Sequence, residues 1–150
     1  MKSKVIRNVL IAILAFLGLG AIGGGAVLII SPSGNLIGMP LSMLNTSPFR
    51  SFLIPGIILF LMLGILPILL IIALVRKPAS KFADQFNSFR DMHWSWTYTI
   101  YIAFFLIFWI QIEMVMLSAV SWLHSFYMLL AVLIIFVALL PQVRNLYKIF

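Results

Sequence analysis

Three residues whose side chains could do acid–base chemistry are expected to meet: Arg50, Glu113 and His124. Glu113 is the only ionisable residue well inside an apolar run, and His124 lies at the start of the next run. Arg50 ends a long uncharged stretch that begins after Arg7. A carboxylate beside a histidine could relay protons. Alternatively, the three side chains form a polar cluster that holds helix ends together without any chemistry. We favour this structural interpretation.

The expected depth of Glu113 supports the structural interpretation. If a membrane-spanning helix begins near Ser95, Glu113 lies about 27 Å along it at the helical rise. The hydrocarbon layer is about 30 Å thick, so the carboxylate approaches the outer boundary rather than the midplane. Arg50 begins another span at the same level. We therefore expect an Arg50–Glu113 ion pair, with His124 beside it, as an outer polar cluster or ligand pocket.

Metal, cofactor and nucleophile chemistry are not expected. His93 and His124 are predicted at opposite membrane faces, roughly 30 Å apart, which excludes haem held by both. One histidine with one glutamate is too little for a metal site. The chain has no cysteine for thiolate ligands, and no phosphate loop, nucleophile elbow or zincin motif. We expect no cofactor and no enzymatic activity.

The composition predicts a membrane protein. Of 150 residues, 64% are hydrophobic and 9% are charged, and the mean hydropathy is +1.21. A water-soluble domain of this size could not cover so much apolar surface. The apolar runs are continuous rather than alternating, which favours helices over a membrane barrel. The net charge of +7 resides in short clusters beside these runs, so it does not indicate nucleic acid.

Four runs are long enough to cross a bilayer, and they form one all-α domain over 1–150. The predicted spans cover about 5–30, 52–75, 95–117 and 122–140. A cleaved signal peptide is the alternative for the first span, because a basic start precedes it and small residues occur at 24–26. A retained helix is favoured because the apolar run continues to Ile30.

The basic residues predict the orientation of the spans. Nine of the ten Lys and Arg residues fall before or at the start of span one, between spans two and three, or after span four. Arg50 alone falls on the other side. Because cytoplasmic segments are enriched in Lys and Arg, both termini are expected in the cytoplasm.

Small residues and prolines mark the expected packing. Gly20 and Gly24 form a small-xxx-small pair in span one, which permits close helix approach. This favours packing within the bundle, and a dimer or ligand groove is the alternative. Pro55 and Pro67 predict kinks in span two.

The two longer loops are expected at the membrane interfaces. The outer loop, 31–50, is too apolar to stand in water and should fold back as a short helix or cap. In the inner loop, 76–93, Phe82, Phe86 and Phe89 recur at helical spacing. This spacing predicts an amphipathic interfacial helix, which membrane anchoring explains without a partner protein.

Several short segments carry a resemblance. They are PSG at 32–34, LIGMP at 36–40, SPFR at 47–50, FLIPG at 52–56, HWSWT at 93–97, WL at 122–123 and PQVR at 141–144. Together they resemble a family of small bacterial four-span membrane proteins with no assigned activity. The resemblance covers most of the chain and implies a bacterial inner membrane, but its motifs name no chemistry.

Three functions are compatible with these features. The first is a non-enzymatic bundle that serves as an accessory or scaffolding subunit or binds a lipid or other amphiphile. The second is a small proton-coupled transporter or channel subunit that uses Glu113. The third and weakest is an enzyme acting on a lipid or quinone through Glu113 and His124. Membrane lipids are the expected partners, and a homo-oligomer or a larger membrane complex is left open.

Overall fold

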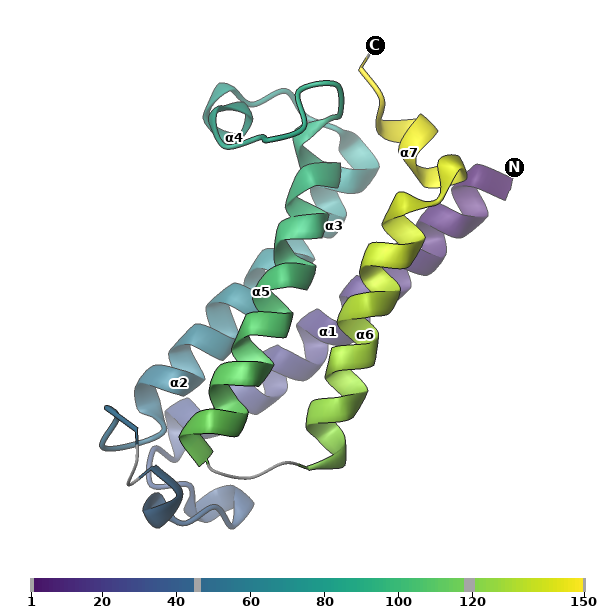
Figure 1. Cartoon of the computed structure of the whole chain (residues 1–150). Coiled ribbons are helices and arrows are strands. Elements are labelled where there is room, and N and C mark those ends of the chain that lie inside the picture. Colours follow the sequence, from purple (N-terminus) through teal and green to yellow (C-terminus); the bar gives the residue numbers. More distant parts are fainter. Residues whose placement is uncertain (1, 45–46, 118–120, 150) are drawn as a thin grey trace.

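The computed structural model describes residues 2–44, 47–117 and 121–149. Four long helical segments cross one another along the molecule (Figure 1). They are α1 (Lys2–Ile30); α2 (Leu53–Ile58) continued by η3 (Leu59–Ile65) and α3 (Leu66–Arg76); α5 (Trp94–Leu117); and α6 (Trp122–Leu139). All four are long and apolar enough to span a membrane. The described residues form no strand and only one isolated β-bridge, between Met92 and Lys148.

The two ends of this bundle differ. Both termini lie at one end, together with α4 (Lys81–Gln85) and α7 (Pro141–Tyr147), and we call it the terminal end (Figure 1). The opposite end carries the segments 31–44 and 47–52, which we call the cap. The cap contains two short 3-10 helices, η1 (Asn35–Ile37) and η2 (Leu41–Leu44). Leu44 is buried, so this segment packs onto the bundle as the apolar outer loop predicts.

The second span widens before a proline. Leu59–Ile65 is a π-helix, and the Leu66 N–H bonds back five residues to the Leu61 carbonyl. Pro67 has no N–H to donate, and its ring crowds the preceding turn, so a wider helix relieves the crowding. Pro55 instead lies in the first turn of α2, where a missing N–H leaves no helical bond unmade.

Glycines bring α1 close to the second span. A Cβ added to Gly25 would lie 2.7 Å from the Phe60 nitrogen and 2.8 Å from the Gly56 carbonyl oxygen. A Cβ at Gly18 would lie 3.1 Å from the Gly64 carbonyl oxygen. The two backbones therefore approach where both helices lack side chains.

The terminal half of the bundle is densely packed. Leu10 and Leu14 of α1, Leu74 of α3, Ala103 of α5 and Ile134 of α6 are completely buried. These residues belong to four different helices and form the core of this half. The interior at this end is therefore filled by side chains.

The C-terminal segment is fastened to the terminal end. Leu140 leaves the helical conformation before Pro141, and the Ala138 carbonyl accepts a hydrogen bond of 2.8 Å from Trp96 Nε1. The hydroxyl of Tyr147 is buried and donates to the Leu74 carbonyl at 2.7 Å. The His93 N–H donates to the Tyr147 carbonyl at 2.7 Å. Burial raises the pKa of Tyr147, which keeps its hydroxyl protonated as a donor.

The loop between spans two and three differs from its prediction. The amphipathic helix expected within 76–93 is only five residues long, because Asn87 lies buried beyond its end. The Asn87 amide donates to the Met92 carbonyl and accepts from the Phe89 N–H and the Thr97 hydroxyl. These side-chain bonds replace helical ones and turn the chain.

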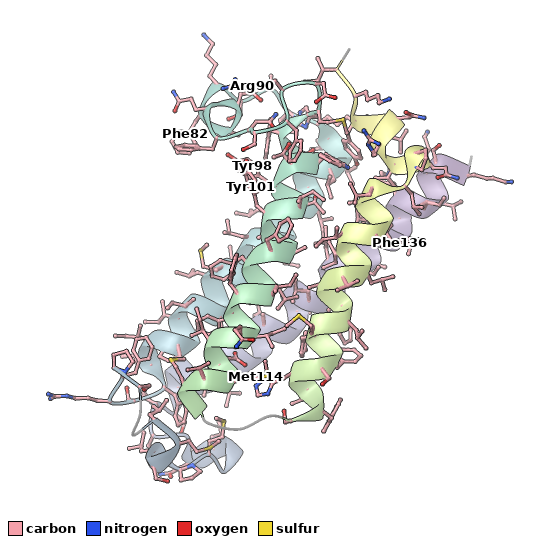
Figure 2. The ribbon with its side chains drawn as sticks, in the orientation of Figure 1. Phe82, Arg90, Tyr98, Tyr101, Met114 and Phe136 are labelled. Carbon is pink, nitrogen blue, oxygen red and sulfur yellow. The ribbon has the colours of Figure 1, made fainter. Side chains whose placement is uncertain are left out.

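The loop rests on α5 through two tyrosines. The Tyr98 and Tyr101 hydroxyls donate to the Ala83 and Phe86 carbonyls at 2.8 and 2.6 Å, and both tyrosines lie directly beneath the loop in Figure 2. Phe82, Phe86 and Phe89 are 73%, 59% and 42% exposed. Their insertion at a membrane interface stays a prediction.

Candidate binding pocket

An apolar pocket of about 460 Å³ lies beneath the cap. All four spans contribute to its walls, and the cap contributes Met39, Met43 and Leu44. In α1, the second span and α5, the lining residues nearest the terminal end along the chain are Leu17, Leu63 and Leu106. Beyond that level lies the dense core of the terminal half. The pocket is therefore a chamber in the cap half of the bundle.

The two glycines singled out for helix packing line this chamber. A Cβ at Gly24 would meet only Leu59, at 3.6 Å, which is an ordinary contact. A Cβ at Gly20 would lie 3.1 Å from the Tyr127 hydroxyl of α6. The closest backbone approaches are made elsewhere, at Gly18 and Gly25. Gly20 and Gly24 leave space on the pocket side of α1.

Glu113 and His124 meet at the polar end of the pocket. Glu113 lies near the end of α5, and His124 lies in the first turn of α6. His124 Nε2 lies 3.3 Å from Glu113 Oε2, and the two side chains are 11% and 28% exposed. The two helices therefore bring together two of the three residues predicted to cluster.

The hydrogen bond at the other ring nitrogen of His124 indicates which nitrogen carries the proton. His124 Nδ1 accepts a hydrogen bond of 3.1 Å from the backbone N–H of Ser121. A nitrogen that accepts a bond carries no proton, so the proton of this imidazole lies on Nε2. Nε2 lies beside the Glu113 carboxyl group. His124 is thus a neutral neighbour of Glu113 rather than a positively charged partner.

Two aromatic side chains complete the polar end. Trp109 of α5 lines the pocket and is 6% exposed. Its indole N–H approaches the Glu113 carboxylate but forms no well-aligned hydrogen bond in the described part of the chain. Tyr127 of α6 lines the same region, with its hydroxyl directed at Gly20. Polar atoms are few, and the rest of the lining is almost wholly apolar.

Arg50 does not join the site. It is exposed and lines a separate shallow pocket with Ser42 and Ser47 of the cap. The predicted Arg50–Glu113 ion pair is not formed, and Glu113 pairs with His124 instead. A long arginine side chain at the cap surface keeps its charge in water, whereas the neutral imidazole enters the apolar chamber at a smaller desolvation cost.

The donor set at this site is small. In the described ranges, no three His, Asp or Glu side chains lie together where they could hold a metal ion. Glu113 and His124 offer one carboxylate and one nitrogen that already contact each other. What the arrangement can do is bind an apolar group in the chamber and a polar group at its end.

Sequence reasoning missed Trp109, Tyr127 and the cap methionines as pocket residues. Trp109 occurs four residues before Glu113, and Tyr127 three after His124, so each shares a helix face with an ionisable residue. That spacing was a usable signal. Met39 and Met43 gave no such signal in the sequence, because only the fold of the cap places them over the chamber.

The chain matches no known protein family, no curated protein and no solved structure.

Proposed function

We propose that this chain is a non-enzymatic membrane protein that binds a single-chain amphiphile beneath its cap. The hydrocarbon chain lies in the apolar chamber, and the head group lies at the Glu113–His124 end. An accessory role, in which the protein presents or sequesters this amphiphile, follows from such binding. Scaffolding without a ligand is the weaker form of the same proposal.

The chamber itself is the observation that carries the proposal. Its volume of about 460 Å³ falls within the range of small-molecule sites, roughly 300 to 1,000 Å³. Leu17, Leu59 and Ile110 are typical of its walls, and its two acid–base side chains, Glu113 and His124, lie together. An apolar chamber with a polar end matches the two parts of an amphiphile.

Transport is the competing proposal, with Glu113 as the proton-coupling residue. The packed terminal half weighs against it, because Leu10, Leu14 and Ile134 occupy the interior there. Proton flux in proteoliposomes that depends on a substrate gradient and disappears in Glu113→Gln would favour transport over binding.

For location, we propose a bacterial inner membrane with both termini in the cytoplasm. The nine Lys and Arg residues away from the cap all belong to segments at the terminal end, and Arg50 belongs to the cap. This asymmetry supports a cytoplasmic terminal end. The bacterial origin rests on the sequence resemblance alone.

Fluorescence quenching tests chain binding directly. Trp109 lines the chamber and is shielded from lipid, so a brominated chain quenches it only from inside. We would titrate 12-bromododecanol into protein in nanodiscs and subtract the signal of Trp109→Phe, which lacks the reporter. The proposal predicts saturable quenching. Quenching that rises linearly, as expected for partition into bulk lipid, would refute it.

Two glycines of one helix provide the matched variants. Gly24→Leu places a side chain in the chamber and should abolish saturable quenching. Gly23 does not line the chamber, and a Cβ added there meets nothing within 4 Å, so Gly23→Leu should preserve the quenching. If Gly24→Leu does not give a cooperative thermal transition, Ala21→Leu fills the same wall. Equal quenching in a folded filling variant and in Gly23→Leu would contradict binding in the chamber.

A further inference from the structure

We infer that the polar end of the chamber selects an amphiphile with a positively charged head group, such as an alkylammonium. This inference rests on the proposed function, because it concerns the head of the molecule whose chain fills the chamber. Three observations carry it: the Glu113 carboxyl group in the wall of the chamber, the location of Arg50 in a separate pocket, and the aromatic side chains that line the same chamber.

The Glu113 carboxyl group has polar neighbours but no basic counter-charge. His124 Nε2 lies 3.3 Å from Glu113 Oε2, and its Nδ1 is occupied by the Ser121 N–H, so the imidazole brings no positive charge. The Trp109 indole N–H lies nearby without a well-aligned hydrogen bond. An ionised carboxylate in an apolar chamber is stabilised by a cation beside it.

The protein supplies no such cation in its described ranges. Arg50 is exposed in a separate pocket, and no Lys or Arg forms an ion pair with Glu113. The other basic residues belong to segments at the opposite end of the bundle. A positively charged head group would therefore meet attraction at Glu113 without nearby repulsion.

Aromatic rings supply the second element of cation recognition. Trp109 and Tyr127 both line the chamber beside Glu113 and His124. The faces of tryptophan and tyrosine rings attract ammonium groups, most strongly where water is excluded. A methylated ammonium suits such a site better than a small metal ion, because its surface is apolar and it needs no set of oxygen ligands.

Other head groups fit less well. An anionic head, such as a carboxylate or sulfate, would be repelled by Glu113 while His124 stays neutral. An uncharged hydroxyl would make hydrogen bonds but would leave the Glu113 charge without compensation. The order of affinity expected for one chain length is therefore cation, then alcohol, then anion.

The experiment compares three head groups on one brominated chain. Saturable quenching of Trp109 is measured with 12-bromododecyl-trimethylammonium, 12-bromododecanol and 12-bromododecanoic acid in nanodiscs of zwitterionic lipid. We expect the ammonium compound to bind about tenfold more tightly than the alcohol. The net charge of +7 attracts the acid to the protein surface, so surface electrostatics alone would favour the opposite order.

Two charge-removing variants separate the site from the surface. Glu113→Gln keeps the shape and an acceptor beside His124, and it should reduce the ammonium affinity to about that of the alcohol. Asp91→Asn removes the same charge from an exposed position at the terminal end and should leave all three affinities unchanged.

Each outcome decides one of the two proposals. Equal saturable binding of the three probes, or tightest binding of the acid, would overturn the head-group inference and leave chain binding intact. A cation preference that survives in Glu113→Gln would also overturn it. Absence of saturable quenching with every probe would overturn the proposed function itself.

Discussion

At the residue scale, one imidazole connects the start of α6 to the end of α5. His124 accepts the Ser121 N–H at Nδ1 and places Nε2 3.3 Å from Glu113 Oε2. The hydrogen bond satisfies a backbone donor beside the first turn of α6, as a capping side chain does. The Nε2 contact is made with the only acidic side chain within the spans. Both roles depend on the same neutral tautomer.

Replacing His124 should therefore weaken the protein measurably. In His124→Ala the hydrogen bond from Ser121 and the contact with Glu113 are lost, and we expect the free energy of unfolding to fall by about 1 to 2 kcal/mol. Thermal unfolding in detergent, followed by circular dichroism, measures the change. Ser125→Ala alters an exposed neighbour on the same helix and should be neutral. Equal stability of the two variants would show that the His124 contacts contribute little.

The composition of the polar cluster was partly predictable. The position of each residue along its predicted span placed Arg50, Glu113 and His124 at the same depth in the membrane, and Glu113 and His124 are in contact. Depth alone does not show whether Glu113 pairs with Arg50 or with His124. That choice depends on the direction in which the cap leaves the bundle, and on the Ser121 N–H that holds the imidazole.

At the element scale, local side-chain bonds override helical periodicity. The spacing of Phe82, Phe86 and Phe89 predicts a longer helix than α4, which ends at Gln85. Asn87 is 4% exposed and bonds to three groups in the loop and in α5. An asparagine on the polar face of a predicted helix gives no sign that tertiary structure will bury it.

Asn87 is thus expected to hold the loop against α5. In Asn87→Ala three partners lose their bonds, and the loop should open more often, because unsatisfied buried groups cost about 1 to 3 kcal/mol each. Limited trypsin digestion in detergent should then cleave the Arg90–Asp91 bond at least about tenfold faster. Gln85→Ala serves as the control, because the Gln85 side chain is exposed and forms no hydrogen bond with the described part of the chain. Equal cleavage rates would contradict the assigned role of Asn87.

The glycines show a second limit at this scale. Gly20 and Gly24 have the familiar spacing, yet the tightest backbone contacts are made by Gly18 and Gly25. Every glycine of α1 is equally suited to close approach by its composition. Which one faces the second span depends on the rotation of α1, and the π-helix before Pro67 affects that fit.

At the scale of the whole molecule, charge and apolar surface are arranged along one axis. Basic residues gather at the terminal end, and the chamber lies in the cap half. The four spans and the common end of the termini follow from apolar length and from the even number of crossings. The chamber could not be predicted, because it depends on how four helices splay beneath the cap.

The proposed orientation can be measured by cysteine labelling, since the chain has no cysteine. Asn35→Cys lies on the exposed cap and Asn145→Cys on exposed α7. In spheroplasts, a membrane-impermeant maleimide should label the first variant directly and the second only after permeabilisation. The reverse pattern would place the terminal end outside.

The central claim is that one amphiphile chain occupies the chamber, and native mass spectrometry measures this most directly. Protein released from nanodiscs that contain dodecyl-trimethylammonium should retain one bound amphiphile per chain. Gly24→Leu should lose it, and Gly23→Leu should retain it, because only the first side chain enters the chamber. A bound molecule retained equally by both variants, or by neither, would contradict the account.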